Sequence, residues 1–121
     1  MAAVYLAREE RLDRQVAVKV LAPDLAAEAA FRTRLLRESR AAAAIGHPHI
    51  IPVYEAGDAD GILYVAMRYV PGGDVRSLLS RAGPLALATA WSILAQAASA
   101  LIGQVSHDAQ WPDRIAELLR A

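Results

Sequence analysis

The 121-residue sequence predicts an α+β fold with an antiparallel sheet. Segments rich in β-branched and aromatic residues form two neighbouring pairs, residues 3–8 with 15–21 and residues 50–57 with 62–70. A segment free of Gly and Pro, residues 28–44, separates the pairs, and only helix-like segments follow them. Strands adjacent in sequence, followed by helices, are typical of an antiparallel sheet with helices packed on it.

The first pair of strands should form a hairpin. AVYLAR (residues 3–8) and QVAVKVL (residues 15–21) are joined by EERLDR, a charged turn. Pro23 with Asp24 ends the second strand. The helix predicted over residues 28–44 contains mostly Ala, Leu, Arg and Glu, which favour helix, and Gly46-His47-Pro48 ends it.

The second pair of strands should form another hairpin. In IIPVYEAG (residues 50–57), Pro52 is best placed at a sheet edge or at the start of a strand. Residues 58–61 end in Asp-Gly, which is typical of a tight hairpin turn, and ILYVAMRYV (residues 62–70) follows. Pro71-Gly72-Gly73 ends this strand.

Helical segments fill the rest of the chain. Asp74 can cap a short helix that reaches about Arg81, and a long helix starts at residue 85. After Pro112 we expect one or two amphipathic turns. These boundaries predict three parts, which are an N-terminal sheet unit, the two helices and a tail: residues 1–73, 74–106 and 107–121.

Composition excludes several classes of function. The chain has no cysteine, which excludes disulfides, thiolate metal sites and cysteine nucleophiles. Its formal net charge is zero, so no basic excess points to nucleic acid. Residues 85–105 carry no charge and have about the length of a membrane span, but their Ser, Thr, Gln and Ala content indicates a helix buried in a soluble protein. The N-terminus has no signal-peptide pattern, so we expect a cytoplasmic chain.

Lys19 is the only lysine beside twelve arginines, and it lies inside an apolar strand. Alternation places it on the strand face of Ala17 and Leu21. On a helical wheel, Glu38 falls inside the apolar stripe of the first helix: Phe31, Leu35, Ala42 and Ile45. A buried carboxylate needs a cation or a proton, and Lys19 can supply the cation. A structural ion pair, or a lysine whose stem runs along a sheet edge, is an equally open interpretation.

Taken together, these segments resemble the N-terminal lobe of bacterial, eukaryotic-like Ser/Thr protein kinases. The resemblance extends from Val4 to about Leu101. VYLA, at residues 4–7, resembles the strand that leaves the glycine-rich loop, and VAVK, at residues 16–19, resembles the V-A-I-K motif. Glu38 falls where the family's helix glutamate pairs with that lysine.

Two later segments extend the resemblance. HPHII, at residues 47–51, is similar to the loop and strand that follow the family's helix. AMRYVPGGD, at residues 66–74, is similar to the gatekeeper and hinge, with Met67 as the gatekeeper. The fold that this implies is a kinase-like N-lobe, a twisted antiparallel sheet with one packed helix, followed by helices of an incomplete C-lobe.

The resemblance implies an ATP site with two catalytic residues. Lys19 would bind the α- and β-phosphates, and Glu38 would orient it. A compact ammonium on a flexible stem can bridge two phosphate oxygens and a carboxylate, whereas a planar guanidinium needs another geometry. Val4 and Ala17 would cover the adenine. The remaining contacts would come from the hinge, with backbone groups of Arg68 and Val70 at the adenine edge and Asp74 near the ribose.

The chain also departs from the family pattern. The glycine-rich loop would precede Val4, and its third glycine would stand where the chain has Ala2. The catalytic loop H-R-D-x-x-x-x-N and the metal-binding D-F-G are missing, because the chain has no asparagine and its single Phe is followed by Arg32. We therefore expect a fragment truncated at both ends, a pseudokinase that binds ATP weakly or not at all. Mg²⁺ would bind only if a complete site were supplied elsewhere.

Other functions remain open. The apolar surface of helix 85–105 suits an interaction or dimerisation module, with a protein partner or a second copy. A degenerate gene fragment without function is a third interpretation. His47 and His49 flank Pro48 without a third ligand, so we expect no metal site there. The helix arginines at 32, 34, 37 and 40 form a solvated face, with phosphate or partner binding as the alternative.

Overall fold

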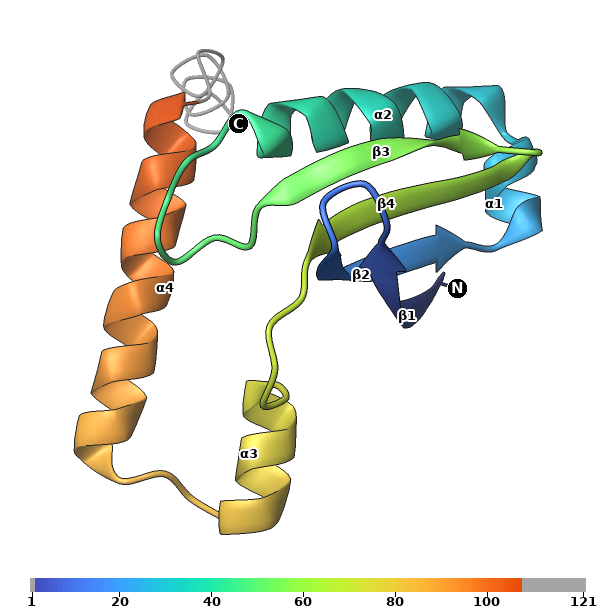
Figure 1. The fold of residues 1–121 in the computed structure, drawn as a ribbon. Helices are drawn as coiled ribbons and strands as arrows, with labels where there is room; N and C mark the ends of the chain where they lie inside the picture. The colour runs from blue at the N-terminus through green and yellow to red at the C-terminus, as the bar shows by residue number, and fades with distance from the viewer. Residues whose placement is uncertain (1, 108–121) are drawn as a thin grey trace. The chain divides into compact units, whose positions relative to one another are not determined.

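The computed structural model describes residues 2–107, which divide into two units. The first unit consists of the chain up to Gly46 together with Ile51–Gly72, and it contains the sheet (Figure 1). The second unit joins His47–Ile50 to the segment that starts at Gly73, and it contains two helices. Each unit is described by itself.

The first unit is built on a four-stranded antiparallel sheet, as the sequence predicts. Its strands are β1 (Ala2–Glu9), β2 (Arg14–Leu21), β3 (Val53–Ala59) and β4 (Ile62–Arg68). The spatial order is β1-β2-β4-β3, so β1 and β3 form the two edges. The pairing of β1 with β2 is regular along its whole length, whereas β3 has a register shift between Val53 and Glu55.

The turn between β3 and β4 has the chemistry expected from its Asp-Gly pair. Asp60 and Gly61 both have left-handed backbones, with φ of 53° and 82°. Two positive φ values in a two-residue loop match the twist of the flanking strands, and Asp and Gly adopt them at low cost. The Asp58 carboxylate accepts a 2.8 Å hydrogen bond from the Gly61 N–H, which fixes the turn further.

Two helices follow β2, although the sequence predicts only one. The helix α1 (Pro23–Ala27) begins at Pro23. From the sequence, this proline is expected only to end the preceding strand. Proline also suits the first position of a helix, because its missing N–H would have no partner there. The helix α2 (Ala29–Ala43) agrees with the predicted helix to within a residue at each end. Figure 1 shows α2 running along the sheet beside β3.

The core of this unit lies between the helices and one end of the sheet. Leu63 is fully buried, and it clusters with Leu21 and Ala26. Phe31 and Leu35 of α2 pack against this cluster. Burying such side chains contributes roughly 1.5–3 kcal/mol each, so this contact is the main force that holds the helices on the sheet.

An ion pair adds a polar link between α2 and the sheet. The Arg32 guanidinium pairs with the Asp58 carboxylate of β3 and donates a 3.3 Å hydrogen bond to the Ala26 carbonyl. Asp58 also holds Gly61, so one carboxylate joins the helix to the β3–β4 turn.

The second unit contains α3 (Val75–Ala82) and α4 (Leu87–His107), as the sequence predicts. His47 lies against α4, where its Nε2 is 3.2 Å from the Ser99 hydroxyl. A Cβ atom at Gly103, one turn further along, would lie 2.7 Å from the His47 ring, so this close approach requires glycine. In residues 2–107, we find no helix with the length and hydropathy needed to cross a membrane.

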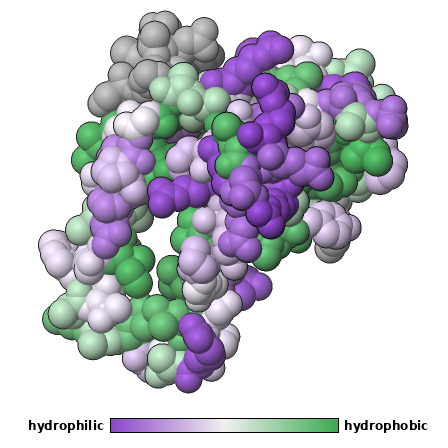
Figure 2. Space-filling model, in the orientation of Figure 1, coloured by the Kyte–Doolittle hydropathy of each residue, from purple (hydrophilic) through white to green (hydrophobic). Residues whose placement is uncertain are grey.

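The expectation that the long helix is buried is wrong for the described residues. Leu87 is 86% exposed and Trp91 72% exposed, and Leu94 and Leu101 are exposed as well. Figure 2 shows hydrophobic surface over the unit that α3 and α4 form. Apolar composition alone suggested burial, but residues 2–107 contain no second helical layer over this face of α4.

We predict that Leu63→Ala lowers the free energy of unfolding by about 2–5 kcal/mol, because it leaves a cavity in the contact between helix and sheet. Urea unfolding followed by circular dichroism measures the change. Ile62→Ala is the matched control, because Ile62 is 50% exposed and should cost far less. Equal losses in the two variants would contradict this placement of the core.

Candidate functional site

Four of the residues predicted to contact a nucleotide share one face of the sheet. Directly paired residues of an antiparallel sheet point to the same side. Val4 pairs with Lys19, and Ala17 pairs with Met67. Since Ala17 and Lys19 are two residues apart on β2, all four side chains lie on the same face.

This face is also the one that the helices cover at its far end. Leu21, two residues beyond Lys19, belongs to the core beneath α1 and α2. Exposure varies along the rest of this face: Ala17 and Met67 are half-buried, whereas Lys19 is exposed and Val4 is 63% exposed. Beyond the core, this face therefore combines apolar side chains of differing exposure with the exposed ammonium of Lys19.

Glu38 does not lie where the sequence predicts it. Its side chain is 59% exposed and forms a 3.2 Å ion pair with Arg34, one turn earlier on α2. Among residues 2–107, no ion pair joins Glu38 to Lys19. The prediction of a carboxylate on the buried stripe is therefore wrong for this arrangement.

The helical wheel explains this error. The side of α2 that faces inward contains Phe31, Leu35 and Ser39, each four residues after the last, and Ser39 is buried. Steps of four residues turn this stripe slowly around the helix. By the third turn the stripe passes through Ser39, and Glu38 lies outside it.

The two predicted hinge residues differ in their backbone environment. The Arg68 N–H donates a 3.0 Å hydrogen bond to the Pro52 carbonyl, so this donor is already engaged within the sheet unit. Val70 lies beyond the end of β4, and its side chain is 51% exposed. A ligand contact from Arg68 would therefore have to use its carbonyl.

Asp74 belongs to the second unit, where it caps α3 as the sequence predicts. Its carboxylate accepts hydrogen bonds from the Ser77 N–H at 2.8 Å and from the Ser77 hydroxyl at 2.7 Å. These two bonds, that from the hydroxyl first, lower the pKa of Asp74 below its ordinary value. The ribose contact that the resemblance implies for Asp74 stays a prediction.

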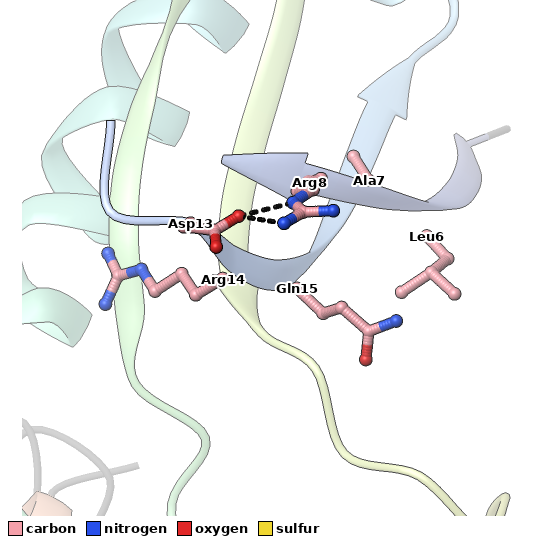
Figure 3. A pocket seen from close by; sticks show the side chains of 6 residues that line it. All are labelled: Leu6, Ala7, Arg8, Asp13, Arg14 and Gln15. Carbon is pink, nitrogen blue, oxygen red and sulfur yellow. Dashed lines mark hydrogen bonds and ion pairs between the residues drawn. The ribbon is translucent and has the colours of Figure 1, made fainter. Parts of the chain in front are cut away.

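A small hollow lies at the turn of the β1–β2 hairpin (Figure 3). In this view Arg8 and Asp13 point toward one another and form an ion pair. The hollow is lined by Leu6, Ala7, Arg8, Asp13, Arg14 and Gln15. None of the residues predicted to bind a nucleotide lines it, although Leu6, which does, pairs with Ala17 on the same face of the sheet.

The structural role of the His47 loop was not predicted from the sequence. The His47 ring accepts a 3.1 Å hydrogen bond from the His49 N–H, and its other nitrogen meets Ser99. No group of three His, Cys, Asp or Glu side chains suited to a metal occurs among residues 2–107. Ser99 and Gly103 are four residues apart and therefore lie on the same face of the long helix. This spacing was the feature of the sequence that could have predicted the contact with His47.

Comparison with known proteins identifies the family. The model of the protein kinase domain matches residues 1–107. The chain belongs to the protein kinase family. Serine/threonine-protein kinase PknE of Mycobacterium tuberculosis (strain ATCC 25618 / H37Rv) is 42% identical over 101 residues, which are 84% of this chain and 18% of PknE. Serine/threonine-protein kinase PknB of Mycolicibacterium smegmatis is 44% identical over 105 residues, covering 84% of this chain and 17% of PknB.

A solved kinase supports the same conclusion at the level of the fold. The crystal structure of the Mycobacterium tuberculosis PknI kinase domain superimposes with a TM-score of 0.78 at 36% sequence identity. The match covers 88% of this chain and 44% of the PknI chain. The chain therefore corresponds to the N-terminal lobe region of a bacterial Ser/Thr kinase, and it spans less than a fifth of the PknE and PknB chains that it matches.

We predict that acid weakens the cap of α3. Because the pKa of Asp74 is lower in the folded chain, its capping contribution is present above its ordinary pKa and is lost as the pH falls through the lowered value, below about pH 4. Thermal unfolding followed at 222 nm between pH 2 and pH 7 measures this. Asp74→Asn, which caps without titrating, should lack this part of the pH dependence. An unchanged profile in Asp74→Asn would contradict the assignment.

Proposed function

We propose that this chain is the ATP-binding lobe of a Ser/Thr protein kinase and that it does not transfer phosphate by itself. The observation that carries the proposal is the shared sheet face of Val4, Ala17, Met67 and Lys19. An apolar surface beside a single cation suits a ligand that is flat and aromatic at one end and anionic at the other. ATP has this chemistry, and the family uses it.

Lys19 would hold the phosphates. Lys19 is exposed, so a phosphate would replace the water around its ammonium. The side chain would not first have to leave a buried position. Val4 and Ala17, paired with or adjacent to it along the face, would cover the adenine, and Met67 would limit the depth of the pocket as gatekeeper. The Arg68 carbonyl and the backbone of Val70 would complete the adenine edge.

Glu38 would act as the partner that orients Lys19, after a change of α2. Phosphoryl transfer in kinases requires this lysine–glutamate pair. An exposed ion pair between helix residues four apart is worth about 0.3–0.5 kcal/mol, so the pair with Arg34 opposes the change only weakly. A rotation of α2, or a new rotamer of Glu38, would bring its carboxylate toward the face that Lys19 shares.

The sequence argues against turnover by these 121 residues alone. Kinases hold Mg²⁺ with the Asp of D-F-G and the Asn of the catalytic loop, and use the Asp of the H-R-D motif as catalytic base. This chain has neither motif and no asparagine. Residues 2–107 do not bring three metal-binding side chains together either. The chain would bind nucleotide, and the remaining groups would have to come from elsewhere.

We predict that ATP raises the thermal stability of the chain and that Lys19→Met removes this effect. A ligand that binds only the folded state stabilises it by about 1.4 kcal/mol at ten times its dissociation constant. Differential scanning fluorimetry over a range of ATP concentrations measures the shift. Arg11→Met, which removes a cation from the β1–β2 turn, is the control and should keep the full shift. The absence of any ATP-dependent shift in the wild-type chain would contradict the proposal.

We also predict no measurable phosphate transfer from ATP to a protein substrate by the isolated chain, because the catalytic base and metal ligands are missing from its sequence. Incubation with radiolabelled ATP and a general substrate such as myelin basic protein tests this. Transfer that is abolished by Lys19→Met would refute the prediction. Transfer that survives Lys19→Met would instead indicate a contaminating kinase.

The surface of α4 favours a second candidate, a non-catalytic interaction module. Its exposed residues follow alternating steps of four and three, the spacing of a seam that pairs with another helix: Leu87, Trp91, Leu94, Ala98 and Leu101. Residues 85–105 contain no charge that would oppose such pairing. Self-association that ignores nucleotide and is lost in Trp91→Glu would favour this candidate over the first.

A further inference from the structure

The side chain of Arg14 connects two strands that are not neighbours in the sheet. Arg14 is the first residue of β2, and its guanidinium lies over the ring of Tyr54 on β3, 3.7 Å from the ring centroid. The sheet order puts β4 between these two strands, so the side chain of Arg14 crosses β4. Figure 3 shows it extending toward β3. A cation over the face of an aromatic ring is attracted by the ring's quadrupole, so this contact holds β2 and β3 together.

Arg14 crosses β4 at the end where the predicted hinge begins. The pairing of β2 with β4 ends at Val16 and Arg68. Continued by two residues, the same antiparallel register places Arg14 opposite Val70. Arg14 therefore lies beside the residue whose backbone is predicted to contact the adenine edge.

An irregularity in β3 places Tyr54 where Arg14 can reach it. A register shift makes Tyr54 an extra residue of β3, because Val53 and Glu55 pair with two adjacent residues of β4. An extra residue of this kind breaks the regular alternation of a strand and re-aims a side chain, and such bulges are common beside functional sites. The local backbone of β3 is thus shaped for the contact between the ring and the guanidinium.

Glu9 of β1 holds the same guanidinium from a third strand. Glu9 pairs with Arg14 in the β1–β2 ladder, and its carboxylate forms an ion pair with the Arg14 Nε. The side chains of Arg14 and Glu9 are 36% and 31% exposed, so water and salt screen this pair less than a pair at the open surface. Glu9, Arg14 and Tyr54 together form a contact across the end of β4, which we call the hinge clamp.

The hinge clamp lies on the face of the sheet opposite the candidate nucleotide site. Along β2, Arg14 and Val16 point to one side of the sheet, and Ala17 and Lys19 point to the other. Arg14 therefore does not contact a ligand on the Lys19 face. It can affect such a ligand only through the backbone of β4 and of the hinge that follows it.

We propose that the hinge clamp positions the backbone of Val70 for the adenine edge, and that it thereby sets the preference of the site for adenine over guanine. This role rests on the proposed function, in which backbone groups of Arg68 and Val70 contact that edge. Adenine presents an amino donor where guanine presents a carbonyl acceptor. Discrimination between them depends on where the backbone groups lie, because the wrong base leaves a buried polar group unpaired. ATP and GTP carry the same triphosphate, so Lys19 does not contribute to this preference.

The test is the affinity of the full chain for ATP and for GTP, measured by isothermal titration calorimetry in the wild type and in clamp variants. Arg14→Leu and Tyr54→Leu each remove the contact between the cation and the ring. Each should lower the ratio of ATP affinity to GTP affinity by at least about fivefold, the loss expected when one hydrogen bond is weakened. Tyr54→Phe keeps the ring and should keep the ratio. Arg11→Leu, which removes a neighbouring cation of the β1–β2 turn, should keep it as well.

Hydrogen exchange provides a second measurement, made without nucleotide. The Arg68 N–H is bonded to the Pro52 carbonyl at the same end of β4. In Arg14→Leu and Tyr54→Leu this amide should exchange faster, because the end of β4 is held less firmly, whereas Tyr54→Phe should exchange at the wild-type rate. Unchanged exchange in both leucine variants would overturn the inference.

Other results would overturn it as well. These are a wild type without preference for ATP, a ratio that stays constant in both leucine variants, or equal losses of ATP and GTP affinity, which a purely structural role would cause. If the leucine variants fail to fold, Glu9→Gln decides, because it removes the carboxylate that holds the guanidinium and keeps the shape of the side chain. Its ratio should fall, and an unchanged ratio would overturn the inference.

Failure of the clamp and failure of the proposed function give different results. A wild type that binds neither nucleotide refutes the proposed function, and the role of the clamp with it. A wild type that prefers ATP, with clamp variants that keep this preference, refutes the role of the clamp alone.

Discussion

The packing of α2 against one end of the sheet is the contact on which the first unit depends. Leu63 is fully buried in a cluster with Leu21 and Ala26, and Phe31 and Leu35 pack against this cluster. The described chain has few other fully enclosed side chains, so this small core carries much of the hydrophobic stabilisation of the unit. Because it sits at one end of the sheet, it holds α2 over β3.

That asymmetry shapes the candidate site. Lys19 lies two residues from the core residue Leu21 on the same face of β2, and it is exposed, whereas its partner Val65 on β4 is 7% exposed. Glu38 lies on α2, whose residues Phe31 and Leu35 pack against the core. It is one residue before the buried Ser39, outside the inward-facing stripe, and its carboxylate forms an ion pair with Arg34. A ligand that needs Lys19 and Glu38 together would require a rotation of α2 or a new rotamer of Glu38.

The face of α4 is left uncovered among the described residues. It is apolar through its side chains, so any apolar surface of suitable shape can cover it. The face of α4 therefore indicates a class of contact and does not select one partner.

The sequence alone determined the strands, the main helix, the Asp-Gly turn and the Asp74 cap, because each depends on neighbours within a few residues. Alternation along β2 was also enough to place Lys19 on the face of Ala17 and Leu21, and motif order was enough to identify the kinase family. Only the tertiary structure decided where Glu38 points, because a residue at the border of a helical stripe is buried or exposed according to how the helix is rotated on the sheet. It likewise decided the exposure of α4, because apolar composition indicates that a surface can be buried but not whether another element covers it.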